Sequence, residues 1–109
     1  MQILINEIDR LRKDLNATIK DLETKGYDKA KTEQEYRVAL SKELLINKDK
    51  GLAATLNNDV SRGNEIIAEL KYKRDVAETM YEVTLERLRA IKIELGIVER
   101  QIEATRRGE

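Results

Sequence analysis

Hydrophobic positions recur at alternating steps of three and four residues along the second half of the chain. From residue 65 to 106 this spacing continues without a slip, through Ile67, Leu70, Arg74, Ala77, Tyr81, Thr84, Leu88, Ile91, Leu95, Val98, Ile102 and Thr105. Such a stripe lies on one side of an α-helix and is typical of coiled coils. It predicts one helix, which is about 60 Å long at the α-helical rise per residue. A second edge of the stripe, which indicates packing against more than one neighbour, is formed by Met80, Val83, Ala90 and Ile97.

The first half of the chain carries a similar stripe with a polar interruption. Over residues 2–25 it consists of Leu4, Ile8, Leu11, Leu15 and Leu22. Residues 23–35 are mostly polar, and from Tyr36 the periodicity returns and ends near residue 49. Gly26 leaves two alternatives. It is either a helix C-cap followed by Asp28 as a new N-cap, or a glycine tolerated inside one helix at a cost of ~1 kcal/mol.

Residues 50–64 form the main break between the two stripes. This connector holds Gly51, Gly63 and three asparagines. Steps of four between its apolar residues predict one short helix, and these residues are expected to close the end of a hairpin: Leu52, Leu56 and Val60. Gly63 is the expected cap of that helix, and Asn64 is the expected N-cap of the next.

The similar lengths of the two arms favour an all-α fold with one long antiparallel helical hairpin. A helix over 2–49 is about 70 Å long, which matches the arm over 65–106. Residues 1–109 are then one helical domain with the connector 50–64 at the tip. The alternative is a three-helix bundle in which the chain reverses at Gly26, which leaves about half of the last helix without a partner.

The hairpin by itself leaves apolar surface uncovered. Its polar stretch around Lys25 and Lys29 lies opposite Met80, Tyr81 and Val83, so the most apolar part of one arm meets the least apolar part of the other. Two helices cannot bury so wide a stripe. A second copy could cover it in a coiled-coil-like four-helix bundle, and a different protein could do so too. The residues expected at this interface are Met80, Tyr81, Val83, Leu85, Leu88, Ile91 and Leu95.

Composition narrows the classes of function. The chain has 21 cationic and 21 anionic side chains and no Cys, His or Pro. Zero net charge does not suit a protein that binds nucleic acid mainly through phosphates. Without Cys or His, disulfides, thiolate chemistry and the usual metal sites of helical bundles are excluded, and the five glycines do not form a phosphate-binding loop. The N-terminal run "MQILINEIDRLRKD" is neither a signal peptide nor a membrane span. We therefore expect a soluble cytoplasmic protein without a cofactor, and not an enzyme.

A cluster of basic residues raises an alternative function, the binding of phosphate groups. Arg74 lies on the stripe itself, where it is expected to meet Tyr36 and to pair with Glu33, Glu43 or a residue of a second subunit. Tyr36 and Arg74 would then set the register, as polar groups in coiled-coil seams do. Phosphate binding remains the competing interpretation of the cations in this region, which are Arg37, Lys42, Lys71 and Lys73. The connector's Asn57, Asn58, Asp59 and Arg62 are candidate binding residues or simply parts of a capped turn.

Two segments carry a family resemblance. At "EYRVALSKELL" (35–45) and "ELKYKRDVAETMYE" (69–82) the chain resembles small helical proteins encoded by bacteriophages and prophages of Gram-positive bacteria. The resemblance spans residues 30–104 and includes Arg62 and Gly63. It implies a viral source and a helical fold, and such proteins tend to be encoded among early, replication or recombination genes. It transfers no catalytic residue.

Together these patterns predict a non-enzymatic adaptor protein in the cytoplasm, and the resemblance implies that it is encoded by a phage and acts in the host cell. It is expected to form homo-oligomers, with a dimer favoured, and to bind an unidentified host or phage protein of DNA metabolism or defence. Nucleic-acid binding through the basic patch is the alternative function.

Overall fold

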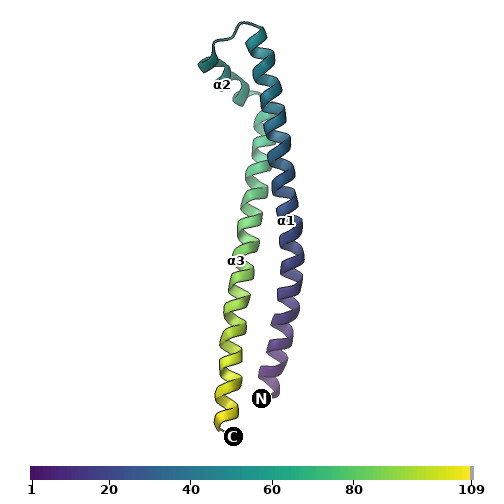
Figure 1. Cartoon of the computed structure of the whole chain (residues 1–109), viewed down its shortest axis with the longest axis vertical. Helices are drawn as coiled ribbons and strands as arrows, with labels where there is room; N and C mark the ends of the chain where they lie inside the picture. The colour runs from purple at the N-terminus through teal and green to yellow at the C-terminus, as the bar shows by residue number, and fades with distance from the viewer. Residues whose placement is uncertain (109) are drawn as a thin grey trace. The chain divides into compact units, whose positions relative to one another are not determined.

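A computed structural model describes residues 1–108, which form three helices and no strand (Figure 1). Helix α1 spans Gln2–Asp49, α2 spans Ala54–Gly63 and α3 spans Glu65–Gly108. The fold is therefore all-α, and the helical hairpin made by α1 and α3 is confirmed. The first arm has the predicted bounds, and the second continues two residues beyond its predicted end.

Helix α1 passes through Gly26 without interruption. The alternative in which the chain reverses at Gly26 into a three-helix bundle is therefore wrong. The stripe does not stop at the polar stretch, because Lys25, Lys29 and Thr32 continue its three-four spacing and are half-buried. A lysine can lay its methylene stem on an interface while its ammonium group stays in water. The seam is thus continuous through residues 23–35, although the polar side chains there make it unrecognisable in the sequence.

The chain divides into two compact units, each containing an antiparallel pair of segments from α1 and α3. Unit 1 comprises Met1–Thr24 and the described residues from Tyr81 onward, and unit 2 comprises Lys25–Met80. Unit 2 also contains α2. Chain length predicted a single domain, and both units share the two long helices.

Unit 1 is held by the apolar seam. Leu11, Leu88 and Val98 are buried there, together with Thr18 and Thr84. The other stripe residues of the unit are half-buried: Leu4, Ile8, Leu15, Leu22, Tyr81, Ile91, Leu95, Ile102 and Thr105. Since full burial of a leucine-sized side chain stabilises by roughly 1.5–3 kcal/mol, this seam supplies most of the packing free energy of the unit.

In unit 2, Gly51 ends helix α1 and turns the chain toward α2. Gly51 has a φ of 85°, a left-handed conformation that glycine adopts without a steric penalty. Its backbone N–H donates to Lys48 O at 2.9 Å, and Leu52 N–H donates to Asn47 O at 3.1 Å. These two bonds form a Schellman motif, which satisfies carbonyl groups at the end of the helix.

A buried polar network then fixes α2 against α1. Asn47 Nδ2 donates to Ser61 Oγ at 2.9 Å, and Ser61 Oγ donates to Asn57 Oδ1 at 2.9 Å. Asn57 Nδ2 donates to the backbone oxygen of Leu44 at 2.8 Å. All three side chains are buried, and Ser61 is completely inaccessible to solvent. Because these groups satisfy one another, the network orients α2 at little cost in buried polar groups.

The expected apolar closure of the hairpin end is wrong. Leu56 and Val60 are about half exposed, at 54% and 48%, and only Leu52 is half-buried. Asn57 and Ser61 are one helical turn apart, so they share a face of α2, and that face turns inward because its polar groups find partners on α1. The short helix itself is confirmed.

The cap assignments at the end of α2 are partly confirmed. Asn64 is the N-cap of α3, since its Oδ1 accepts hydrogen bonds from the backbone N–H groups of Ile66 and Ile67 at 2.9 and 3.3 Å. Gly63, which we expected to be a cap, is instead the last residue of α2.

We predict that Asn57→Ala destabilises the protein by about 1–3 kcal/mol, because it removes two hydrogen bonds and leaves the buried Ser61 hydroxyl and Leu44 carbonyl without that partner. The measurement is urea unfolding followed by circular dichroism, with amide hydrogen exchange to locate the loss in α2. Asn58→Ala is the matched control, since Asn58 is exposed on the same helix. Equal stability of the two variants would contradict the structural role of the network.

Candidate functional site

Arg74 is a charged side chain placed on the seam of unit 2. Its guanidinium carbon lies 4.6 Å from the centroid of the Tyr36 ring, and Tyr36 is buried. This distance is that of a cation–π contact, which is stronger where water is excluded. The predicted meeting of Arg74 with Tyr36 is therefore confirmed.

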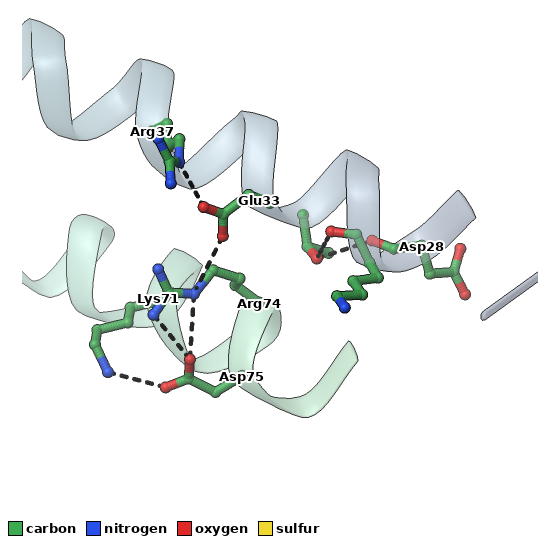
Figure 2. Close-up of polar contacts among 8 residues, drawn as sticks. Asp28, Glu33, Arg37, Lys71, Arg74 and Asp75 are labelled. Atoms are coloured by element: carbon green, nitrogen blue, oxygen red, sulfur yellow. Dashed lines mark hydrogen bonds and ion pairs between the residues drawn. The ribbon is translucent and has the colours of Figure 1, made fainter. Parts of the chain in front are cut away.

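Two carboxylates hold the guanidinium of Arg74 (Figure 2). Nε lies 3.4 Å from Glu33 Oε2 on α1, and Nη2 donates to Asp75 Oδ1 at 3.0 Å. The expected pairing with Glu33 is confirmed, while Arg74 forms no such ion pair with Glu43. Glu33 Oε2 is buried and accepts no hydrogen bond of good geometry from residues 1–108, so the longer contact with Arg74 is its electrostatic partner. An arginine held from both helices is suited to fix the register of α1 against α3.

The neighbouring cations keep both carboxylates ionised. Arg37 Nε donates to Glu33 Oε1 at 2.5 Å and is the main cause of the lowered pKa of Glu33, with Arg74 contributing further. The hydrogen bond from Lys71 Nζ to Asp75, at 2.9 Å, lowers the pKa of Asp75, and Arg74 adds to this effect. Arg37, Lys71 and Arg74 therefore form a mixed-charge cluster with Glu33 and Asp75.

A groove of about 390 Å³ lies beside this cluster, and we call it the basic groove. Its lining residues come from all three helices: Tyr36, Arg37, Leu40, Ser41, Leu44, Arg62, Lys71 and Arg74. Arg62 of α2 is exposed and forms no ion pair with any residue in 1–108. Four cations against the carboxylates of Glu33, Asp75 and Glu78, all of which act on Arg74, leave a net charge of +1, so the groove suits an anionic group.

The structure brings together only some of the predicted phosphate contacts. Arg37 and Lys71 line the basic groove with Arg74, whereas Lys42 lines a different groove with Val38 and Leu70. Lys73 lines neither groove. Sequence reasoning named Arg62 only as a connector residue. Its place in the groove depends on how the buried network orients α2, which no sequence pattern indicated.

The residues of the predicted association surface do not share one environment, since some belong to the seam between the helices and others are exposed. Leu88 is buried within unit 1, so it belongs to the intramolecular contact and not to the surface we predicted. Tyr81, Leu85, Ile91 and Leu95 are half-buried in the same unit. Val83 is exposed there, and Met80 is exposed in unit 2, where it lines a shallow groove with Lys25 and Val76.

Four exposed apolar positions of α3 in unit 1 follow a repeat of their own, and Ile93, which is 64% exposed, lies outside it. They are spaced seven residues apart, and we call them the apolar ladder: Val83, Ala90, Ile97 and Ala104. Each lies one position before a residue of the buried seam, so the ladder forms a separate row along the helix. The second edge noted in the sequence is thus an exposed row and not part of the core.

Charged residues flank one edge of the apolar ladder. Arg87 Nη2 donates to Asp21 Oδ2 of α1 at 2.9 Å. Further along, Glu94 interacts electrostatically with Arg10, which also pairs with Glu7 and Asp14. Exposed pairs of this kind stabilise by at most about 1 kcal/mol each, so their main effect is on the electrostatics of the surface.

Two kinds of site are absent from the described part of the chain. Within residues 1–108, no group of three or more acidic, Cys or His side chains is arranged to hold a metal ion. None of the helices in that range has a stretch long and apolar enough to cross a membrane.

We predict that Glu33→Gln reduces the acid sensitivity of the fold. The folded-state pKa of Glu33 lies below its usual value of 4.5, so its ionised form stabilises the protein above that pH. The contribution decreases as the pH falls through the lower, folded-state pKa. The variant should be less stable at neutral pH and should lose less stability between about pH 6 and pH 3, as measured by urea unfolding. Glu35→Gln removes an exposed carboxylate of the same helix and is the matched control. The same change of pH dependence in both variants would contradict the role of the Glu33 ion pairs.

Comparisons with protein-family models, curated proteins and solved structures give no match to this chain.

Proposed function

We propose that this chain is a non-enzymatic helical interaction protein that self-associates through α3 and docks onto another protein as an adaptor. The observation that carries this proposal is the balance of apolar surface. Among residues 1–108, five hydrophobic side chains are buried and seventeen large ones are exposed. Contiguous exposed apolar surface marks association sites in soluble proteins.

The regularity of the exposed residues supports helix packing as the mode of association. Val83 and Ile97 are 57% and 43% exposed, and they lie in one row with Ala90 and Ala104. A row with a seven-residue repeat is the kind of surface that a partner helix covers along its length. Scattered apolar residues would not have this geometry.

The state of the acidic groups supports a function without catalysis. The pKa values of Glu7, Glu33 and Asp75 are all lowered, in each case chiefly by a hydrogen bond from a neighbouring cation. A general acid or base works best with a pKa near the operating pH, and these shifts move in the opposite direction. Paired surface carboxylates of this type are typical of solvated helix faces.

The resemblance of residues 30–104 to phage and prophage proteins suggests where the interaction takes place. It supports a role in the cytoplasm of an infected cell, with a host or phage protein of DNA metabolism or defence as the partner. Met80 and Val83, the most exposed members of the predicted interface, are then candidate contacts.

We expect sedimentation equilibrium to give at least twice the chain mass of 12.6 kDa. Ile97→Glu and Val83→Glu should shift the protein to the monomer with little loss of helicity, because each adds a charge to the apolar ladder without entering the seam. Ile19→Glu is the matched control: Ile19 has similar exposure in unit 1 but lies on the opposite side of α1 from Asp21 and Ala17. A monomeric wild-type protein would refute self-association.

A second candidate function, nucleic-acid binding, is favoured by the basic groove. Its net charge of +1 is a local excess of positive charge that the chain as a whole lacks. Arg62, which has no ion-pair partner within residues 1–108, is available for a phosphate. Arginine is well suited to this role because its guanidinium binds phosphate through two N–H groups.

This second function predicts retention on DNA at about 50 mM salt and release by about 200 mM, through counterion release. Combining Arg62→Ala with Arg37→Ala should weaken binding and lower the salt slope by about one for each phosphate that the variant no longer binds. Lys73→Ala removes a cation outside the groove and should have little effect. Absence of retention at low salt would eliminate nucleic-acid binding and leave the interaction function in place.

A further inference from the structure

The apolar ladder has the spacing of a symmetric contact. Val83 and Ile97 lie seven residues before and after Ala90 on the exposed side of α3. In an antiparallel pair of identical helices with a two-fold axis at Ala90, residue i of one chain lies level with residue 180 − i of the other. Val83 then meets the partner's Ile97 twice, and Ala90 meets the partner's Ala90. Branched side chains cover each other on both sides, while the small alanine lets the helices approach at the axis.

We propose that the apolar ladder is the dimer contact of this protein, with a second copy of α3 packed antiparallel across a two-fold axis at Ala90. The inference rests on the proposed self-association and adds to it the occupant of the surface, the direction of the partner helix and the register.

The charges beside the ladder select this register. Arg87 and Glu94 lie on the same edge of α3, three residues before and four residues after Ala90. In the Ala90 register, Arg87 comes level, within one residue, with the partner's Glu94, and the pairing occurs twice by symmetry. A shift of one heptad in one direction places Arg87 against the partner's Arg87, and a shift in the other direction places Glu94 against the partner's Glu94. Because like charges in these positions repel, the central register is the one in which this edge of the ladder has complementary charges.

The intramolecular ion pairs extend the same contact. Arg87 already binds Asp21 at 2.9 Å, and Glu94 already interacts with Arg10. A guanidinium has five N–H donors, so Arg87 can bind Asp21 and the partner's Glu94 together. The result is a row that runs from Arg10 through Glu94 to the partner's Arg87 and the partner's Asp21, with alternating charge. Such a network follows the edge of the ladder and orients the two chains.

Cysteine cross-linking tests the register, because the natural chain has no Cys. Three single variants are needed: Val83→Cys, Ala90→Cys and Ile97→Cys. A disulfide requires Cα atoms within about 7 Å. Mild oxidation should therefore link Ala90→Cys to itself, whereas Val83→Cys and Ile97→Cys should each stay unlinked alone and should link to each other when mixed. A size tag on one of the two identifies the mixed product on a non-reducing gel.

Other cross-linking patterns overturn the proposal in distinguishable ways. Self-linking of Val83→Cys and Ile97→Cys as efficient as that of Ala90→Cys indicates a parallel pair. If no variant links while sedimentation still gives a dimer, the ladder is not the contact, although self-association stands. A monomer in sedimentation refutes both this inference and the proposed self-association. Circular dichroism of each variant confirms that the helices are intact.

Charge reversal provides an independent test of the same register. Arg87→Glu alone places two acids together at each pairing, and Glu94→Arg alone places two cations together, so each variant should dimerise about tenfold more weakly than wild type. An equimolar mixture of the two restores opposite charges at both pairings and should regain most of the affinity of the wild-type dimer. A mixture no tighter than either variant alone would show that Arg87 does not face the partner's Glu94.

Discussion

Two α-helices that pack side by side can bury only the stripe along which they touch, and this limit shapes every surface of the molecule. The stripe on α3 keeps its three-four spacing from Ile67 to Thr105, and each of its positions is buried or half-buried. Apolar residues outside it, such as Val83 and Ile97, stay exposed because no third element among residues 1–108 covers them. The seven-residue repeat of α3 therefore produces two parallel rows, the buried stripe and the exposed row next to it. The proposed self-association follows from a hairpin with more apolar positions than one seam can hold.

The two units are stabilised by different kinds of interaction. In unit 1 the buried seam contains Leu11, Leu88 and Val98, so apolar packing dominates. In unit 2 only Tyr36 and Ile67 are buried hydrophobic residues, and the other buried side chains are polar. Hydrogen bonds contribute less to the net free energy of folding than apolar burial does, but they form only when donor and acceptor are correctly oriented. Unit 2 is consequently the part of the chain where register and orientation are most strongly specified.

This division assigns different chemistry to the two units. In unit 2, the buried hydrogen bonds orient α2 and so bring Arg62 to the basic groove, where positive charge exceeds negative charge. The apolar geometry of unit 1 leaves a row of small and branched side chains edged by Arg87 and Glu94. The first surface suits an anionic group, and the second suits another helix. A chain with zero net charge can present both because its charges are distributed locally.

Periodicity and turn residues by themselves determined the all-α fold, the two arms and the existence of the short connector helix, since a heptad stripe is a local property of the sequence. They also indicated that Arg74 meets Tyr36, because folding the hairpin at its connector places these positions opposite one another, but they left Glu33, Glu43 and a second subunit open as its ion-pair partner. Only the tertiary structure decided that α1 continues through Gly26, because Lys25 and Lys29 look polar in sequence although their stems can lie on a seam. It likewise decided that Asn57 and Ser61 face inward while Leu56 and Val60 face outward. Apolar burial is the usual prediction for a short amphipathic helix, and it fails here because the inward face finds specific hydrogen-bond partners on α1. Those partners lie 13 and 14 residues away, on the other side of the turn at Gly51, so the periodicity of a single helix does not indicate them.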